Sequence, residues 1–292
     1  MGRHHVRACA DSPDIDLVAV CDSDTRIAGS VAAEFGCAAT GGLHTLAENI
    51  DIAVIAVPTP AHADVALPLL ETGIACLIEK PIALTLGDAQ RLETAAKARG
   101  TPLRIGHIER FNPAITALRD LLAGGHTLKR VTARRLNPAR DRIYDSDAVL
   151  DLMIHDLDLL WFMNLRDDTH RKPEISIQSS ADFHNAAVTL VFPDGAEASL
   201  SVSRETVSPR RDLVIETNSH TYSVDFTSRR VTESSGDGQR DISVTTADAL
   251  RAQLAAFVSA VRGDTSDVAD ATAATHALTL AQAIRDAAGV ST

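Results

Sequence analysis

Three side chains have the types and the spacing that acid–base chemistry requires. Asp151 and His155 are four residues apart in a largely apolar segment, and Lys80 ends an apolar run directly before Pro81. Side chains four residues apart project from the same face of a helix, so Asp151 would orient the imidazole of His155 or hold its charge. An imidazole, with an ordinary pKa of about 6.5, is well suited to accept a proton near neutral pH. The alternative is an exposed ion pair, which the apolar neighbours disfavour.

Lys80 stands out because the chain uses arginine for nearly all of its positive charges. Of the 28 basic residues only four are lysines, namely Lys80, Lys97, Lys129 and Lys172. A lysine retained at the end of an apolar run suggests a need for a compact ammonium group rather than a planar guanidinium. The other three lysines are expected on the surface.

The first hundred residues alternate between strand-like and helix-like segments. Four short apolar runs predict strands buried on both faces. These runs are Ile15–Val20, Asp51–Val57, Ile74–Ile78 and Pro102–Ile105. Helical spacing predicts helices at 26–35, 61–71 and 85–99 between them. The alternation favours a doubly wound α/β sheet over unrelated strands, and it puts Lys80 at a strand's carboxyl end, where such sheets bind ligands.

The start of the chain matches part of a dinucleotide-binding turn. Such a domain opens with a strand and G-x-G-x-x-G, followed about 20 residues later by an acidic residue. Asp22 closes the run VAVCD at the acidic position, and Gly2 falls on the third glycine, which allows close helix–strand packing. The first strand and the first two glycines would precede Met1, so we expect an N-terminal truncation of about ten residues. A misassigned start and a naturally shortened protein are the alternatives.

The second half of the chain is rich in strand patterns. Strands are predicted at 128–135, 175–182, 187–192, 196–203, 212–217 and 222–226. Helices are predicted at 149–162, 248–262 and 270–288, with a polar loop near 234–239. The expected organisation is a domain over 1–105 and an α+β domain over 106–292, with C-terminal helices that pack back on the first domain.

Three motifs carry a resemblance to a known family. IEKP at 78–81, AVPTPAH at 56–62 and the Asp151-x-x-x-His155 pair resemble, in this order, the Gfo/Idh/MocA family of NAD(P)-dependent sugar and polyol oxidoreductases. The resemblance implies a Rossmann domain, here without its first strand, followed by an open, mostly antiparallel sheet. It also implies that this sheet carries substrate contacts and forms a homodimer or homotetramer.

A narrower resemblance concerns one branch of that family. The stretches GHIERFNP at 106–113, VLDLMIHDLDLL at 149–160 and SVSRETVSPRRDLVIE at 201–216 are similar to members that oxidise the 3-hydroxyl of UDP-N-acetylglucosamine. Those members supply a ketone that an aminotransferase converts to an amine for lipid A. One departure is Asp145–Ala148, where a glycine-containing stretch is usual, which leaves the geometry ahead of Asp151 open.

The resemblance implies a role for each candidate residue. Oxidation of a secondary alcohol needs a hydride acceptor, a base and a donor that stabilises the developing alkoxide. His155 would be the base, Lys80 the donor to the substrate oxygen, and Asp151 the group that orients His155. The expected cofactor contacts are Gly2, Asp22, Val57, Pro58, Thr59, His62, Glu79, Lys80 and Arg110. The expected substrate contacts are Lys80, Arg110, Asn112, Arg135, Arg142 and His155.

Some of these assignments leave alternatives open. The candidates to hold a diphosphate, which guanidinium forks bind, are Arg134, Arg135, Arg140 and Arg142 around the loop before Asp151. Arg135 and Arg142 are favoured; the alternative is that Arg134 and Arg135 alternate across a strand and one of them merely faces solvent. Glu109, the neighbour of Arg110 in GHIERFNP, could equally serve as a salt-bridge partner of Arg110.

The cofactor assignment has alternatives too. The Asp22 carboxylate favours NAD, since it would repel the 2′-phosphate of NADP, while Arg26 one turn on leaves room for NADP. His62 would contact the cofactor or serve only in the first turn of a helix.

Composition and charge limit the other classes of function. The formal net charge of −11 repels nucleic-acid phosphates and anionic membranes. No apolar stretch approaches the roughly 20 residues of a membrane span, and the N-terminus lacks the apolar core of a signal peptide. The four cysteines form no C-x-x-C pair, as expected of thiols in a reducing cytosol. We therefore expect a cytoplasmic protein that binds neither nucleic acid nor membrane.

The same residues allow two rival functions and disfavour a metal site. Asp156 and Asp158 flank His155, but ligands at these spacings cannot converge from one helix, so no metal is expected. The nearest rival function is a dehydrogenase of another sugar or cyclitol, such as inositol or glucose. The rival of another class is a non-catalytic, nucleotide-binding regulatory protein.

Overall fold

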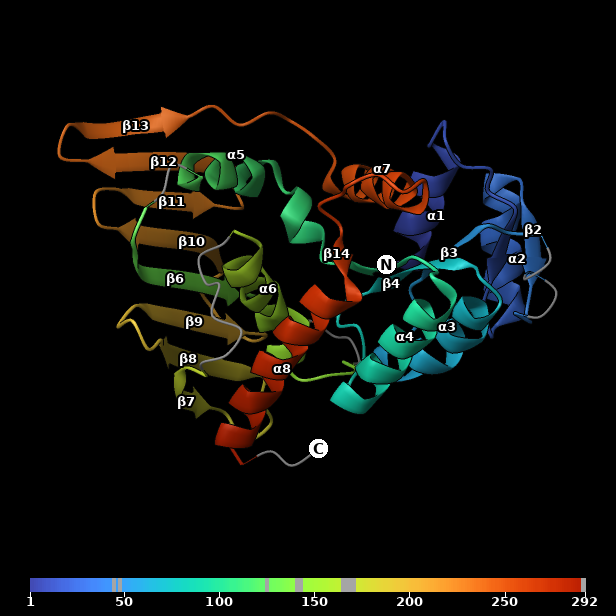
Figure 1. Cartoon of the computed structure of the whole chain (residues 1–292), viewed down its shortest axis with the longest axis horizontal. Helices are drawn as coiled ribbons and strands as arrows, with labels where there is room; N and C mark the ends of the chain where they lie inside the picture. Colours follow the sequence, from blue (N-terminus) through green and yellow to red (C-terminus); the bar gives the residue numbers. More distant parts are fainter. Residues whose placement is uncertain (44–45, 47–48, 124–125, 140–143, 164–171, 290–292) are drawn as a thin grey trace. The chain divides into compact units, whose positions relative to one another are not determined.

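The computed structural model describes residues 1–292 apart from 44–45, 47–48, 124–125, 140–143, 164–171 and 290–292. The chain divides into two compact units (Figure 1). Unit 1 comprises Met1–Ile108 with Asp248–Thr275, and unit 2 comprises Glu109–Ala247 with His276–Thr292. The change of unit after Ile108 lies close to the boundary expected after residue 105. The first of the two C-terminal helices belongs to unit 1.

Unit 1 alternates strands and helices, as the sequence predicts. Its strands are β1 Ala19–Cys21, β2 Ala38–Thr40, β3 Ile52–Ile55, β4 Ala75–Glu79, β5 Leu103–Gly106 and β14 Ala269–Asp270. Its helices are α1 Gly2–Ala10, α2 Thr25–Phe35, α3 His62–Glu71, α4 Leu86–Arg99 and α7 Ala249–Val261. β3, β4 and β5 are parallel neighbours, and β14 pairs antiparallel with β5. Every residue of β4 is buried, which explains its continuous apolar run.

The strands of unit 1 form two separate sheets in the described part of the chain. β1 pairs only with β2, and β3 pairs only with β4. The two sheets are therefore separated between β1 and β3. The sequence predicts that the first strand of a dinucleotide-binding sheet belongs at this place. A Cβ placed on Gly2 meets no described atom within 4 Å. The close helix–strand contact expected at this glycine is thus not seen among these residues.

Glycines and a polar cap define the ends of the unit 1 helices. Gly36 and Gly100 follow α2 and α4 with φ of 71° and 64°, the left-handed conformation that ends a helix. The Thr85 hydroxyl accepts the backbone N–H of Asp88 at 3.1 Å and caps α4. β1 is shorter than the predicted run Ile15–Val20 because only its end pairs with β2.

Unit 2 is built on one eight-stranded sheet in the order β13-β12-β11-β10-β6-β9-β8-β7. Its strands are β6 Leu128–Leu136, β7 Glu174–Ser179, β8 Asn185–Val191, β9 Glu197–Ser203, β10 Arg210–Thr217, β11 Thr221–Asp225, β12 Arg230–Ser235 and β13 Gly238–Ile242. All neighbours are antiparallel except β6 and β9, which are parallel. This arrangement confirms the open, mostly antiparallel sheet.

The helical parts of unit 2 lie beside this sheet. They are α5 Pro113–Leu122, a π-helical turn at Val149–Met153, α6 Ile154–Phe162, and the end of α8 Ala271–Ala287. α5 and α6 lie over the same side of the sheet (Figure 1). Arg285 of α8 pairs with Asp147 at 2.8 Å, and the His276 ring meets the Trp161 ring edge-on at 4.7 Å. The end of α8 therefore packs against α6 and the segment that precedes it.

Three features of unit 2 differ from the predictions. The helix predicted over 149–162 begins as a π-helical turn and becomes α-helical at Ile154. The polar loop predicted near 234–239 is a hairpin of β12 and β13, and β13 is almost wholly exposed, so it has no apolar pattern. The sequence patterns did not indicate α5, although Asn112 caps it and Pro113 takes its first position, two signals of a helix start.

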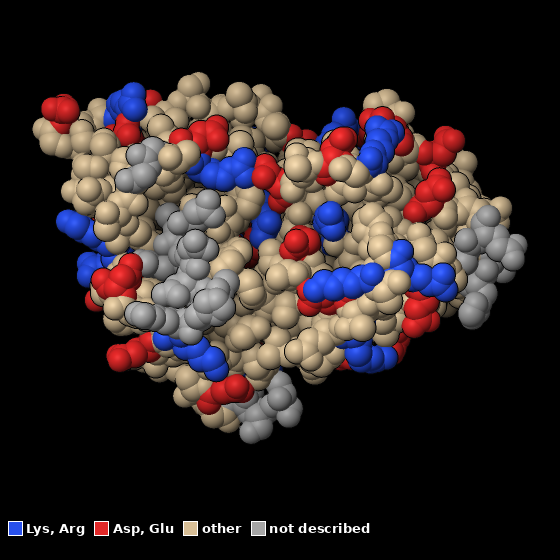
Figure 2. Space-filling view, in the orientation of Figure 1, with Lys and Arg blue, Asp and Glu red and all other residues tan. Residues whose placement is uncertain are grey.

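Acidic and basic side chains occur together on the face of the molecule shown in Figure 2. No described helix is both long enough and apolar enough to cross a membrane. Burial raises the pKa of the Cys9 thiol to about 11 and that of Cys76 to about 12, so both thiols stay protonated near neutral pH.

Candidate active site

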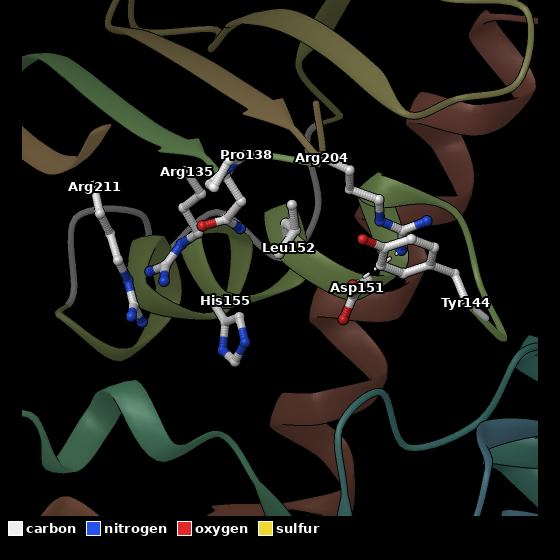
Figure 3. A pocket seen from close by; sticks show the side chains of 9 residues that line it. Arg135, Pro138, Tyr144, Asp151, Leu152, His155, Arg204 and Arg211 are labelled. Atoms are coloured by element: carbon white, nitrogen blue, oxygen red, sulfur yellow. Dashed lines mark hydrogen bonds and ion pairs between the residues drawn. The ribbon is translucent and has the colours of Figure 1, made fainter. Parts of the chain in front are cut away.

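A pocket of about 240 Å³ in unit 2 collects most of the reactive side chains of that unit (Figure 3). It is lined by Arg135, Asn137, Pro138, Tyr144, Asp151, Leu152, His155, Arg204 and Arg211. Its volume lies below the range of about 300–1,000 Å³ that is usual for drug-sized ligands. The pocket therefore has room for one small polar ring, such as a sugar, and the rest of a larger ligand would extend beyond it.

Asp151 and His155 reach this pocket from the π-helical turn and from α6. Asp147 fixes the start of this segment, because its Oδ1 accepts the backbone N–H groups of Val149 and Leu150, both at 3.0 Å. The Asp147 carbonyl also accepts the N–H of Asp151 at 2.9 Å. The departure noted at Asp145–Ala148 is thus accommodated by an aspartate that caps the turn.

Arg204, which the sequence patterns did not single out, contacts the Asp151 carboxylate. It follows β9, and its Nη2 donates to Asp151 Oδ2 at 3.0 Å. Its guanidinium lies 3.9 Å from the centre of the Tyr144 ring. Figure 3 shows the Asp151–Arg204 contact beside Tyr144. The stretch SVSRETVSPRRDLVIE contains Arg204 and Arg211, so its resemblance to one branch of the family was the available signal.

Arg135 lines the pocket but is held in a buried ion-pair cluster. Its Nε donates to both carboxylate oxygens of Asp156, at 2.8 and 2.9 Å, and its Nη1 donates to Glu109 at 3.3 Å. Arg211 also donates to Glu109, and its side chain is 46% exposed. Burial acts to raise the pKa of Glu109, but Arg135 and Arg211 outweigh it and hold that pKa below its usual value. Arg211, rather than Arg135, presents a solvent-facing cation to the pocket.

We expect this cluster to be essential for folding. Arg135→Met would leave the Asp156 and Glu109 carboxylates buried with less positive charge, at a cost of about 3–5 kcal/mol in the free energy of unfolding. Urea unfolding followed by circular dichroism measures this loss. Arg130→Met, which removes an exposed pair with Glu197 from the same strand, is the matched control and should cost less than about 1 kcal/mol. Equal losses in the two variants would contradict the assignment.

Arg110 and Asn112 make contacts within unit 2. Arg110 donates to Asp158 through Nε at 2.8 Å and through Nη2 at 2.5 Å, and both side chains are buried. Asn112 caps α5 and donates to Glu109 at 3.2 Å. Glu109 therefore pairs with Arg135 and Arg211, not with Arg110, which was one alternative. Asp158 forms a structural ion pair with Arg110. The predicted substrate residue Arg142 lies outside the described residues.

Two of the remaining predicted residues directly follow the carboxyl ends of strands in unit 1. Lys80 follows β4, and Asp22 follows β1. The neighbouring Glu79 is buried and bonds to His5 Nε2 of α1 at 2.6 Å. A Cβ on Gly106 would lie 3.3 Å from the Cα and the carboxyl group of Glu79, so β5 passes this residue closely and a side chain there would require Glu79 to shift. The hydrogen bond and charge of His5, with Lys80, outweigh burial and hold the pKa of Glu79 below its usual value.

His62 joins two of the predicted cofactor segments. Its imidazole is buried and lies 3.0 Å from the Pro81 carbonyl and 3.1 Å from the Val57 carbonyl. Burial lowers the pKa of His62, while the hydrogen bonds to the Val57 and Pro81 carbonyls act in the opposite direction. Pro58 and Thr59 lie between Val57 and His62, with Thr59 buried. His62 therefore ties the AVPTPAH segment to the IEKP segment.

Two observations fit unit 1 to a dinucleotide. Asp22 is half-buried at the end of β1 and accepts the backbone N–H of Asp24 at 2.9 Å through Oδ1, which leaves Oδ2 suited to a ribose hydroxyl. The nine-residue helix α1 has no acidic residue in its first turn, so its N-terminus suits a phosphate group. Gly2 is the first residue of that helix.

Comparisons with known proteins agree with these features. Residues 1–107 match the oxidoreductase family with an NAD-binding Rossmann fold, Gfo/Idh/MocA. The chain is 33% identical over 297 residues to UDP-N-acetylglucosamine 3-dehydrogenase of Acidithiobacillus ferrooxidans, covering 98% of this chain and 93% of that protein. A solved structure of that enzyme aligns with a TM-score of 0.90 over 98% of this chain and 94% of that one. Inositol 2-dehydrogenase of Rhizobium meliloti is 29% identical over 220 residues, or 70% of this chain and 66% of that protein.

Fold, site and relatives together define an oxidoreductase that uses NAD and whose relatives act on sugars and cyclitols. The chain belongs to the Gfo/Idh/MocA family. This result confirms the resemblance drawn from the IEKP, AVPTPAH and Asp151-x-x-x-His155 motifs. It favours an enzyme over the non-catalytic regulatory protein.

Proposed function

We propose that the protein oxidises the 3-hydroxyl of UDP-N-acetylglucosamine with NAD. The observation that carries this proposal is the pocket in which Asp151 and His155 lie beside Arg135, Arg204 and Arg211. A base with the exposed guanidinium of Arg211 beside it suits an anionic sugar nucleotide better than a neutral cyclitol. The relative that is 33% identical over nearly the whole chain carries that activity in its name.

In the proposed reaction each residue has one task. His155 accepts the proton of the 3-hydroxyl, and Asp151 orients its imidazole. Lys80 donates to the same substrate oxygen and stabilises the negative charge that develops there. NAD, when bound, supplies the hydride acceptor, with Asp22 on its ribose and α1 toward its phosphates.

The wider setting of the reaction is part of the same proposal. The 3-ketone product is what an aminotransferase would need to place an amine on the sugar, as in the synthesis of amide-linked lipid A. That setting is the bacterial cytoplasm. The half-exposed residues on one face of β6, β9 and β10 support assembly into a homo-oligomer through the eight-stranded sheet.

The test is NADH formation by the purified protein with UDP-N-acetylglucosamine. We expect kcat/KM with this substrate to exceed that with inositol or glucose by about tenfold or more, since only the nucleotide sugar presents a diphosphate. Free N-acetylglucosamine is the control for the nucleotide part. Turnover of inositol without turnover of UDP-N-acetylglucosamine would favour the second candidate, a cyclitol dehydrogenase like the Rhizobium meliloti relative.

A further inference from the structure

We propose that Arg204 is a positioning residue that holds Asp151 in its working orientation in the pocket. This role rests on the proposed function only in that Asp151 serves His155 in an alcohol oxidation. Arg204 lies in the stretch 201–216, to which the sequence patterns assigned no role in the active site. Its contacts are what connect it to the chemistry.

The first step of the argument is the contact itself. One nitrogen of Arg204, Nη2, donates both to Asp151 Oδ2 and to the backbone carbonyl of Asp147, each at 3.0 Å. The exposed fractions of the side chains are 4% for Arg204 and 18% for Asp151. Charge-assisted hydrogen bonds of this kind are stronger than neutral ones, and low exposure strengthens them further. The bond therefore restricts the rotamer of the Asp151 carboxylate.

The second step is that Arg204 is itself held in place. Its guanidinium packs on the Tyr144 ring at 3.9 Å, which fixes the plane of the fork. The Asp147 carbonyl that it contacts also accepts the N–H of Asp151 at 2.9 Å. Asp147 is anchored in turn by Arg285 of α8 at 2.8 Å. Arg204 thus joins the end of β9 to a turn that is fixed from another side by α8.

The third step is the geometry of the π-helical turn. Asp151 lies within this turn, whereas His155 lies in the α-helix that follows. A π-helix takes more residues per turn than an α-helix, so the four-residue spacing does not by itself align the two side chains. An external contact is needed to fix where the carboxylate points. Arg204 supplies that contact from a different strand.

The test is a double-mutant cycle of Arg204→Met and Asp151→Asn in the full-length protein. We expect Arg204→Met to lower kcat by about 10–100-fold with little change in KM, because the residue supports a catalytic group and does not bind substrate. If Arg204 acts through Asp151, adding Arg204→Met to Asp151→Asn lowers kcat by less than about threefold further. Multiplicative losses, or a loss confined to KM, would overturn the proposal.

Two controls separate positioning from a general effect on folding. Arg230→Met removes a bidentate pair with Asp241 on β12 and β13, far in sequence from the pocket lining, and should leave kcat unchanged. Arg204→Lys keeps a cation near Asp151 without the planar fork, so it should recover part of the lost kcat. Arg204→Lys with no more activity than Arg204→Met would contradict an electrostatic hold on Asp151.

A measurement without substrate keeps this proposal distinct from the proposed function. The same cycle followed by urea unfolding should show coupling, with the double variant less destabilised than the two single variants predict together. Absence of coupling would overturn the Arg204–Asp151 link whatever the substrate proves to be. If coupling is present but UDP-N-acetylglucosamine is not oxidised, the proposed substrate is wrong and the Arg204–Asp151 link stands. The kinetic cycle is then run with the sugar that the protein does oxidise.

Discussion

His155→Ala is expected to lower kcat by about 10²–10⁴-fold, the usual contribution of a positioned general base. The affinity for NAD should not change, because His155 lines the pocket of unit 2 and the residues expected to hold the dinucleotide phosphates and ribose lie in unit 1. Steady-state kinetics of NADH formation measure the first effect. Fluorescence titration with NADH measures the second.

The matched control for this variant is His220→Ala. His220 lies in the turn between β10 and β11, stacks on Tyr222 and does not line the pocket. Its replacement should leave kcat within about twofold, because the half-buried His220 ring packs on Tyr222 outside the pocket lining. Activity of His155→Ala close to that of His220→Ala would refute the role of base.

Lys80→Met is expected to lower kcat by about 10²–10³-fold, which is the usual effect of removing one hydrogen-bond donor to a developing oxyanion. NADH should still bind, since methionine keeps the apolar part of the side chain and the other residues expected to contact the cofactor are unchanged. Lys80→Arg should not restore full activity, because a planar guanidinium is larger than an ammonium and disperses its charge. The same steady-state assay compares the three proteins.

Lys97→Met provides the control for lysine replacement in general. Lys97 is 72% exposed and pairs with Glu93 on the outer side of α4. We expect wild-type kinetics from it. Full activity of Lys80→Arg would mean that any cation serves at this position, which would remove the argument from the rarity of lysine in this chain.

The fold of unit 1 could be predicted well because its elements are marked locally. Buried strands such as β4 appear as continuous apolar runs, and helix ends are marked by residues such as Thr85 and Gly100. β13 gave no such signal, because its residues face solvent and need no apolar side chains. Local pattern therefore predicts a buried strand such as β4 and misses β13, which is held mainly by backbone pairing with β12.

The candidate site was predictable only in part for a similar reason. Lys80, Asp151 and His155 occur in short motifs, so their spacing was visible in the sequence. Arg204 reaches Asp151 from 53 residues along the chain, a contact that no local spacing reveals. The engagement of Arg135 with Asp156 and Glu109 was likewise invisible, since it depends on how β6 packs on α6.

The buried cluster beneath the pocket has a consequence for how a charged ligand would arrive. Its two guanidiniums, Arg135 and Arg211, are balanced by the carboxylates of Glu109 and Asp156. The cluster therefore adds no net charge to the electrostatic field far from the protein surface, and the net charge of −11 repels an anion there. Attraction operates only at contact range, inside the screening length of about 8 Å at physiological ionic strength. The association rate constant of an anionic ligand should thus be low and should differ little between ligands. Selectivity should then come from differences in the dissociation rate constant.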